Sequence, residues 1–474
     1  MDLHISLVGR KNLSGEIYRQ IRHAITDGRL RPGDCLPATR HLARSLQVSR
    51  TTVAVAYDRL SAEGFLTSRT GAGTFVSDHL PATRQKTMSE RSEGALRARP
   101  FWDSVQLSRA FAKPAEFDFR SGLPDATLFP HEEWRRLLAR ELRSHAATAG
   151  VYDESGGNRH LREAIARHVG VSRGLQVSAG DVTITNGAQQ AIDLVARTLV
   201  APGDCVAVED PGYAPPRYLF SSLGARVQGV PVDDEGIVVD AIAPETRLVY
   251  VSPSHQYPLG VTMSLARRLA LLDWATRHNA AIIEDDYDSE FRFEVRPLEP
   301  LRTLDTSGRV VYVGSFSKTL LPTLRLGFLV TPSCCTTAVH KAKYVSDWHT
   351  STLVQLVLAR FIDDGGFARH LRKLGRVYAE RRALITNILK RDFADHLTVV
   401  PSIAGLHITA VARTASIDDI KRVFDCAGER GVQTQRLERF YFEQPALAGL
   451  LFGYGAIPTA KIPEGLCKLR RCFD

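Results

Sequence analysis

The sequence lacks any apolar run that approaches the roughly 20 residues needed to cross a bilayer. Its first residues, MDLHISLVGRKN, also lack the hydrophobic stretch of a secretion signal. The seven cysteines are an odd number, are scattered and include no C-x-x-C pair, which argues against a disulfide framework and against a zinc site. We therefore expect a cytoplasmic protein with no membrane contact and no bound metal.

Positive charge is concentrated near the start of the chain. Residues 1–80 contain eleven basic and seven acidic residues, and residues 81–115 contain seven and three, which leaves only +1 of the formal charge of +9 for the rest. A polyanionic partner is therefore expected at the N-terminal quarter. Because 474 residues exceed one ordinary core, we expect a compact basic domain at 10–77, a polar linker at 78–115 and a larger domain at 116–474.

The 10–77 segment has the pattern of a helix-turn-helix followed by a β-hairpin. The helical stretches ATRHLARSLQ and RTTVAVAYDRLSAEG are separated by a tight turn, and FLTSRTGAGTFVSD has two β-type runs around a glycine-rich turn. The second helix opens with Ser49, Arg50, Thr51 and Thr52. In helix-turn-helix proteins the start of this helix meets base edges and phosphates, so double-stranded DNA is the expected partner.

These motifs closely resemble the winged helix-turn-helix domain of the GntR family of bacterial repressors. The resemblance covers residues 14–77 and implies that Arg40, Arg50 and Thr52 contact DNA, while Gly73 lets the wing approach the minor groove. The alternative is that Arg40 and Arg50 are ordinary surface arginines of another small domain. The wing and the local positive charge both favour the DNA-binding interpretation.

From Phe117 onward, short runs rich in Val and Ile alternate with helical patterns, which predicts an α/β domain with buried parallel strands. Ligands of such sheets bind at the carboxyl ends of the strands. Asp285 ends the run AIIEDDYD, and Lys318 follows the run RVVYVG. A carboxylate and a lysine in one crevice can serve the ring nitrogen and the aldehyde of pyridoxal phosphate, and the apolar setting lowers the lysine pKa.

A phosphate group would need donors near this lysine. The backbone N–H groups of Gly187, Ala188 and Gln189 lie between a predicted strand and a predicted helix, where an anion can bind. Ser315 and Arg325 flank the lysine and would add a hydroxyl and a guanidinium group. The sequence thus predicts a complete phosphate site.

Two tyrosines complete the predicted ring site. Tyr213, in EDPGY, could stack on the pyridine face, and Tyr287 could hydrogen-bond the 3-oxygen of the ring. The alternative for both is a core tyrosine whose hydroxyl is satisfied within the protein.

The motifs GAQQA, EDPGY, SPSHQYPLG, EDDYDSEFR and SFSKTLLPTLRLG resemble, in this order, the fold-type I aminotransferases. The resemblance implies a mainly parallel large domain and a smaller C-terminal α/β domain. It makes Lys318 the Schiff-base lysine, Asp285 the partner of the pyridine nitrogen and Tyr287 the 3-oxygen donor, with Ser315 and Arg325 as phosphate ligands.

Three further roles follow from the same resemblance. Tyr152 would reach the phosphate of a neighbouring subunit, since these sites lie at a dimer interface. The usual Asn of the Asn-Pro-x-Gly turn is absent, so we assign its contact with the 3-oxygen to Gln256. Arg436, or else Arg439, would hold a ligand carboxylate, and the alternative for either is an exposed arginine.

The combination of a winged helix-turn-helix, a linker and an aminotransferase-like domain in one chain resembles the MocR/GabR subfamily of GntR regulators. This resemblance implies a homodimeric transcription regulator that uses pyridoxal 5'-phosphate and senses an amine, an amino acid or the cofactor itself through the aldimine at Lys318. The alternative is a working amino-acid aminotransferase with an accessory DNA-binding domain. The effector and the operator are not evident from the sequence.

Overall fold

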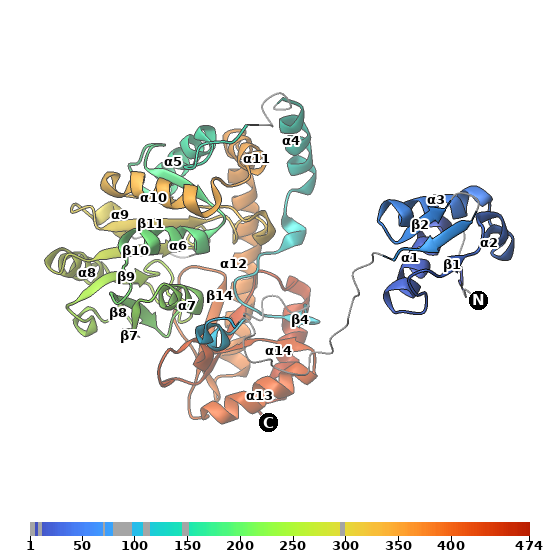
Figure 1. Cartoon of the computed structure of the whole chain (residues 1–474). Coiled ribbons are helices and arrows are strands. Elements are labelled where there is room, and N and C mark those ends of the chain that lie inside the picture. Colours follow the sequence, from blue (N-terminus) through green and yellow to red (C-terminus); the bar gives the residue numbers. More distant parts are fainter. Residues whose placement is uncertain are drawn as a thin grey trace. The chain divides into compact units, whose positions relative to one another are not determined.

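The computed structural model describes residues 5–7, 12–69, 72–78, 97–107, 114–144, 151–293 and 299–474. The chain forms two compact units, Met1–Ala98 and Arg99–Asp474, which are drawn in Figure 1. Most of the predicted linker, residues 79–96 and 108–113, lies outside the described residues.

The first unit is a winged helix-turn-helix, as predicted. Its elements are α1 (Leu13–Thr26), β1 (Cys35–Leu36), α2 (Thr39–Ser45), α3 (Arg50–Ala62), β2 (Leu66–Arg69) and β3 (Gly73–Val76). Ile17 and Ile21 of α1 are spaced by about one turn and pack with Val53 and Leu60 of α3 in one buried core. The strands pair antiparallel in the order β1-β3-β2, and β2 and β3 form the wing.

The second unit is built on an eight-stranded sheet with the order β5-β12-β11-β10-β9-β6-β7-β8. The strands are β5 (Val182–Thr185), β6 (Cys205–Asp210), β7 (Arg226–Asp233), β8 (Gly236–Ile237), β9 (Thr246–Val251), β10 (Ala281–Asp286), β11 (Val310–Ser315) and β12 (Gly327–Val330). The ladder from β11 to β7 is parallel, whereas β12 is antiparallel to both of its neighbours and β8 is antiparallel to β7. The sheet is therefore mainly parallel, as expected.

Helices cover both faces of this sheet (Figure 1). The helices are α4 (His131–Ser144), α5 (Arg159–Arg173), α6 (Ala188–Leu199), α7 (Ala214–Ser222), α8 (Leu265–Arg277), α9 (Leu301–Leu304), α10 (Ser333–Asp347) and α11 (Thr352–Asp363). Val206 and Val208 of β6 pack in the cluster that contains α6, while Ala207 between them packs in the cluster that contains α8. This alternation places α6 and α8 on opposite faces.

A smaller C-terminal domain packs beside the sheet. Its elements are β4 (Phe117–Asp118), α12 (Gly366–Asp392), β13 (Leu397–Val399), β14 (His407–Ala412), α13 (Ile417–Glu429), β15 (Val432–Gln433), β16 (Gln435–Arg436), β17 (Gly449–Gly453) and α14 (Ile462–Arg470). Four strands form an antiparallel sheet in the order β13-β14-β17-β16, and β15 pairs in parallel with β4. Helix α12 joins the two cores, because Phe367 packs in the large-domain core and Leu374 through Leu389 pack in the small-domain core.

Within the described residues, no helix is both long and apolar enough to span a bilayer.

Candidate functional site

A cavity of about 310 Å³ lies at the carboxyl ends of the strands of the large sheet and is closed on one side by the small domain. The predicted residues that line it are Ala188, Gln189, Tyr213, Asp285, Tyr287, Ser315, Lys318 and Arg325. These side chains come from four separate parts of the chain. The neighbouring parallel strands β10 and β11 bring two of them together, because Asp285 is paired with Val313 and Lys318 follows the end of β11.

Lys318 lies in the wall of this cavity. Its Nζ donates a hydrogen bond to the carbonyl oxygen of Gly122 at 2.7 Å. Burial lowers the pKa of Lys318, and the nearby Asp288 and Asp285 oppose that shift. Gly122 has φ of +80°, and a Cβ at this position would lie 3.0 Å from the lysine Nζ. A glycine there leaves the amine room, and the lowered pKa favours its neutral, nucleophilic form.

Asp285 presents one oxygen that is already bonded and one that is not. Tyr250 donates its hydroxyl proton to Oδ2 at 2.5 Å, whereas Oδ1 is buried and has no hydrogen-bond partner among the described residues. Burial is the main cause that raises the pKa of Asp285 to about 6. A protonated ring nitrogen would satisfy this orphaned oxygen and return the carboxyl group to its ionised form.

The two acids beside Asp285 on β10 are engaged elsewhere. Asp286 accepts a hydrogen bond from Tyr312 and forms an ion pair with Arg173, which helps to lower the pKa of Asp286. Glu284 accepts backbone N–H groups from Leu301 and Arg302 at 2.9 Å. Of the three consecutive acids, only Asp285 lines the cavity.

The phosphate-type cradle forms where β5 leads into α6 and where β12 begins. Gly187 caps α6 with φ of +80°, and a Cβ on it would lie 2.8 Å from Arg325 Nη2. Arg325 itself adopts φ of +51° and donates to the carbonyl oxygen of Asn186 at 2.6 Å. The glycine therefore lets the guanidinium group approach the first backbone N–H groups of α6, at Ala188 and Gln189, which line the cavity.

The two predicted tyrosines both reach the cavity. Tyr213 is 43% exposed and contacts Tyr257 edge-on, with ring centroids 5.8 Å apart. The Tyr287 hydroxyl lies 2.9 Å from the carbonyl oxygen of His255 and 3.1 Å from Nδ1 of the same residue. Its hydroxyl therefore has partners inside the protein as well as access to the cavity.

Gln256 is not among the residues that line the cavity. Its Nε2 donates to the carbonyl oxygens of Pro211 and Tyr257 at 2.8 Å, and its Oε1 accepts from Leu259 N–H at 3.0 Å. The amide therefore stabilises its own turn, and the geometry does not support the expected contact with the 3-oxygen. Tyr257, the next residue, reaches the cavity instead.

Arg436 also points away from the cavity. Residues Gln435 and Arg436 form β16, so their side chains lie on opposite faces of the strand. Arg436 makes an ion pair of 2.9 Å with Glu438 and packs 5.3 Å from the ring of Phe424, whereas Gln435 lines the cavity. The second candidate, Arg439, is exposed and is not part of the lining.

Tyr152 does not line the cavity. It is 73% exposed, and its ring contacts Trp348 and His349 at centroid distances of 4.6 and 5.9 Å. Tyr344 stacks on Trp348, with ring centroids 5.5 Å apart. Together these side chains form an exposed aromatic surface.

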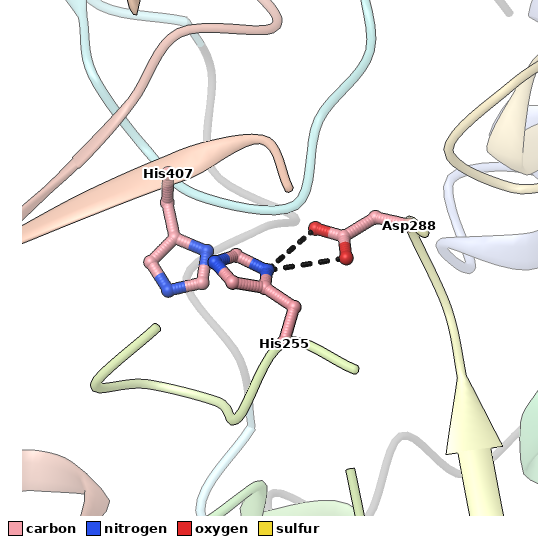
Figure 2. Close-up of side chains that lie close together, drawn as sticks. All are labelled: His255, Asp288 and His407. Atoms are coloured by element: carbon pink, nitrogen blue, oxygen red, sulfur yellow. Dashed lines mark hydrogen bonds and ion pairs between the residues drawn. The ribbon is translucent and has the colours of Figure 1, made fainter. Parts of the chain in front are cut away.

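A group of buried histidines that was not expected from the sequence lies at the edge of the cavity. His255, Asp288 and His407 present donor atoms within 4.8 Å of one another (Figure 2). Internal hydrogen bonds engage all three residues: His255 Nδ1 lies 3.1 Å from both oxygens of Asp288, and His407 Nε2 donates to the carbonyl oxygen of Pro258 at 2.9 Å. The motif SPSHQYPLG contained the one available signal, a histidine beside the expected turn.

The segment Arg120–Gly122 was also missed, because its residues lie in no regular element and carry no periodic pattern. Arg120, Ser121 and Gly122 all line the cavity.

In the first unit, the predicted DNA-binding residues lie at and near the start of α3. Ser49 caps this helix by accepting Thr52 N–H at 3.1 Å, which leaves the exposed Arg50 and Thr51 in the first turn. Arg40 is exposed on α2, and Gly73 begins β3 in the wing with φ of +120°. All are on the surface of the unit except Thr52, which is partly buried.

Comparison with known proteins agrees with this architecture. Residues 13–76 match the family "Bacterial regulatory proteins, gntR family", and residues 119–445 match "Aminotransferase class I and II". The chain is 38% identical to the probable rhizopine catabolism regulatory protein MocR of Rhizobium meliloti, over 97% of this chain and 93% of that protein. It is 35% identical to the HTH-type transcriptional regulator TauR of Rhodobacter capsulatus, over 98% of this chain and 97% of that protein.

Among solved structures, the kynurenine aminotransferase of Pyrococcus horikoshii matches with a TM-score of 0.72 and 27% sequence identity. The match covers 79% of this chain and 96% of the aminotransferase chain. The α-aminoadipate aminotransferase LysN of Thermus thermophilus has a TM-score of 0.71 and 29% identity, with the same coverage.

The fold and the cavity define a DNA-binding regulator with an aminotransferase-type domain. The chain belongs to the MocR/GabR subfamily of GntR transcriptional regulators.

Proposed function

We propose that the protein is a transcription regulator whose aminotransferase-type domain holds pyridoxal 5'-phosphate and responds to an amine. The observation that carries this proposal is the pairing of the Lys318 amine with the orphaned Asp285 oxygen in one cavity, on the same chain as a winged helix-turn-helix. When bound, pyridoxal phosphate supplies an aldehyde that bonds covalently to amines and a ring that withdraws electrons.

Each part of the cavity has a separate task in this proposal. Lys318 Nζ would hold the aldehyde carbon, and Asp285 Oδ1 would accept the proton of the ring nitrogen. Ser315, Arg325 and the start of α6 would bind the phosphate. When an effector amine replaced Lys318, the lysine amine would be free to donate to the Gly122 carbonyl oxygen, to which its Nζ already donates at 2.7 Å.

The DNA partner would be bound by the first unit. The exposed Arg40, Arg50 and Thr51, together with Ser49 and Thr52 at the start of α3, would contact bases and phosphates, and Gly73 would let the wing approach the minor groove. An effector shifts regulation only by as much as it binds one state of the protein better than the other.

The protein would act as a homodimer. The support is the exposed aromatic surface of Tyr152, Tyr344 and Trp348, flanked by Val151 and Val345, which are 78% and 82% exposed. Exposed clusters of large apolar side chains favour protein–protein contact. A second subunit on this surface would place its Tyr152 near the neighbouring cofactor.

The test uses the full chain. Purified protein mixed with pyridoxal phosphate should turn yellow, and borohydride should fix a pyridoxyl group that mass spectrometry locates on Lys318. Lys318→Ala should remove the label while the protein still binds DNA from its own upstream region. A wild-type protein that stays colourless and unlabelled contradicts the proposal.

A working aminotransferase is the second candidate, because the same Lys318 and Asp285 would serve transamination. Incubation with amino acids and a keto acid, followed by measurement of product, separates the two. Fast multiple turnover without specific DNA binding would favour the enzyme.

A further inference from the structure

The small-domain wall of the cavity offers an amide where an arginine was expected. On β16, Gln435 faces the cavity, while Arg436 on the opposite face is already paired with Glu438. The side chain that meets a ligand from this strand is therefore uncharged.

The groups around Gln435 form a chain of neutral hydrogen bonds. Gln435 Oε1 accepts both the N–H and the hydroxyl proton of Ser121, at 2.7 and 2.6 Å. The Ser121 hydroxyl in turn lies 2.8 Å from the Tyr257 hydroxyl, and because its own proton goes to Gln435, the tyrosine is the donor. Gln435 also bonds to Tyr257, but its Nε2 carries two N–H groups, so at least one remains for a ligand.

His407 stands beside this chain and is also uncharged. Burial, and then the neighbouring His255, hold the pKa of His407 well below its usual range. Its Nε2–H is used by the Pro258 carbonyl oxygen. The wall thus contains hydroxyl, amide and imidazole groups with no net charge.

Apart from Lys318 and Asp285, which are assigned to the cofactor, the charged residues that line the cavity already have partners. Arg120 is bound by Asp118, with Nε 2.8 Å from Oδ1, and both side chains are buried. Arg325 lies at the phosphate cradle, and Asp288 faces His255. A ligand carboxylate would enter a site with two lining aspartates and a bound phosphate, and an unmatched buried charge is strongly unfavourable.

We propose that Ser121, Tyr257, Gln435 and His407 form a subsite for an uncharged, hydroxyl-bearing group, so that the effector is a hydroxylated amine and not an amino acid. This inference rests on the proposed function, since the amine end of the effector is assumed to react at the cofactor held by Lys318. A hydroxyl can donate to the Tyr257 or His407 side of the wall and accept from Gln435 Nε2, whereas a carboxylate can only accept.

The experiment compares matched ligands on the full-length protein loaded with pyridoxal phosphate. Serinol is compared with serine, and 3-aminopropanol with β-alanine. In each pair the amino alcohol has a hydroxymethyl group where the amino acid has a carboxylate, and the rest of the molecule is the same. Binding is followed by the change in cofactor absorbance and by the shift in melting temperature. We expect the dissociation constant of each amino alcohol to be lower than that of its carboxylate counterpart by roughly tenfold or more.

Two variants sharpen the test. Gln435→Arg should reverse the preference by placing a cation at the wall. The paired change Arg436→Gln and Glu438→Gln removes the ion pair on the opposite face without leaving a lone buried charge, and should leave the preference unchanged.

Equal affinities, tighter carboxylate binding, or no binding of either amino alcohol at millimolar concentration would overturn the inference. A protein that takes up the cofactor and still prefers carboxylates refutes only this subsite. A protein that takes up no cofactor refutes the proposed function itself.

Discussion

At Asp285, a carboxyl group is buried near other acids before any ring nitrogen is present to balance it. Burial, followed by the charge of Asp286, outweighs the hydrogen bond from Tyr250 and raises the Asp285 pKa to about 6, against about 3.9 in an unfolded chain. Between these two values the folded protein binds more protons than the unfolded chain, so this group makes the cofactor-free protein less stable as the pH rises from about 4 to about 6.

Replacing this acid should therefore stabilise the empty protein. Cofactor-free Asp285→Asn should match the wild type near pH 4 and exceed its free energy of unfolding by about 2 to 3 kcal/mol at pH 7, because the amide never ionises while still accepting the Tyr250 hydroxyl. Urea unfolding at pH 4.5 and pH 7.5 measures the difference. A gap between the two proteins that does not change with pH would contradict this account.

At the scale of the element, α3 combines a stabilising cap with the residues proposed to contact DNA. Ser49 accepts Thr52 N–H, so Ser49→Ala should cost about 1 kcal/mol of stability in the first unit. Arg50 is exposed and has no role in the core, so Arg50→Ala should leave stability unchanged and weaken DNA binding.

The salt dependence of binding tests the contact of Arg50 with DNA. If Arg50 neutralises a phosphate, the slope of log affinity against log salt should decrease by about 1 in Arg50→Ala. Arg422→Ala is the matched control, because Arg422 is an exposed arginine on α13 in the other unit. An unchanged slope in Arg50→Ala, or an equal change in the control, would remove Arg50 from the interface.

Helices and strands in which apolar residues recur at a regular spacing could be predicted from the sequence. The direction in which a single side chain points from a short strand or a turn could not. The helices of the first unit, the strand that ends at Asp286 and the strand that precedes Lys318 follow from the spacing of apolar residues. The choice between Gln435 and Arg436 depends on which of the two side chains lies on the cavity face of the small-domain sheet. That is set by the register of β16 against β17, which depends on tertiary packing. The same one-residue ambiguity separates Gln256 from Tyr257.

At the scale of the whole molecule, the aromatic surface around Trp348 should determine assembly. Trp348→Ala should raise the dissociation constant of the proposed dimer by about 10- to 100-fold, because buried aromatic side chains contribute most to such contacts. Sedimentation at several protein concentrations measures this constant. Leu269→Ala on α8, at a side chain of similar exposure, is the control. A wild-type monomer, or equal constants for both variants, would contradict the assignment.

Helix α12 runs unbroken for 27 residues from the large-domain core into the small-domain core. A helix behaves as a stiff rod because bending it strains successive backbone hydrogen bonds. About 33 Å separate Phe367 from Leu389 along its axis, so a tilt of roughly 5° at one end displaces the other by about 3 Å. A slight tilt of α12 at its large-domain end would therefore be carried to the distal end of the small domain as a displacement of several ångström.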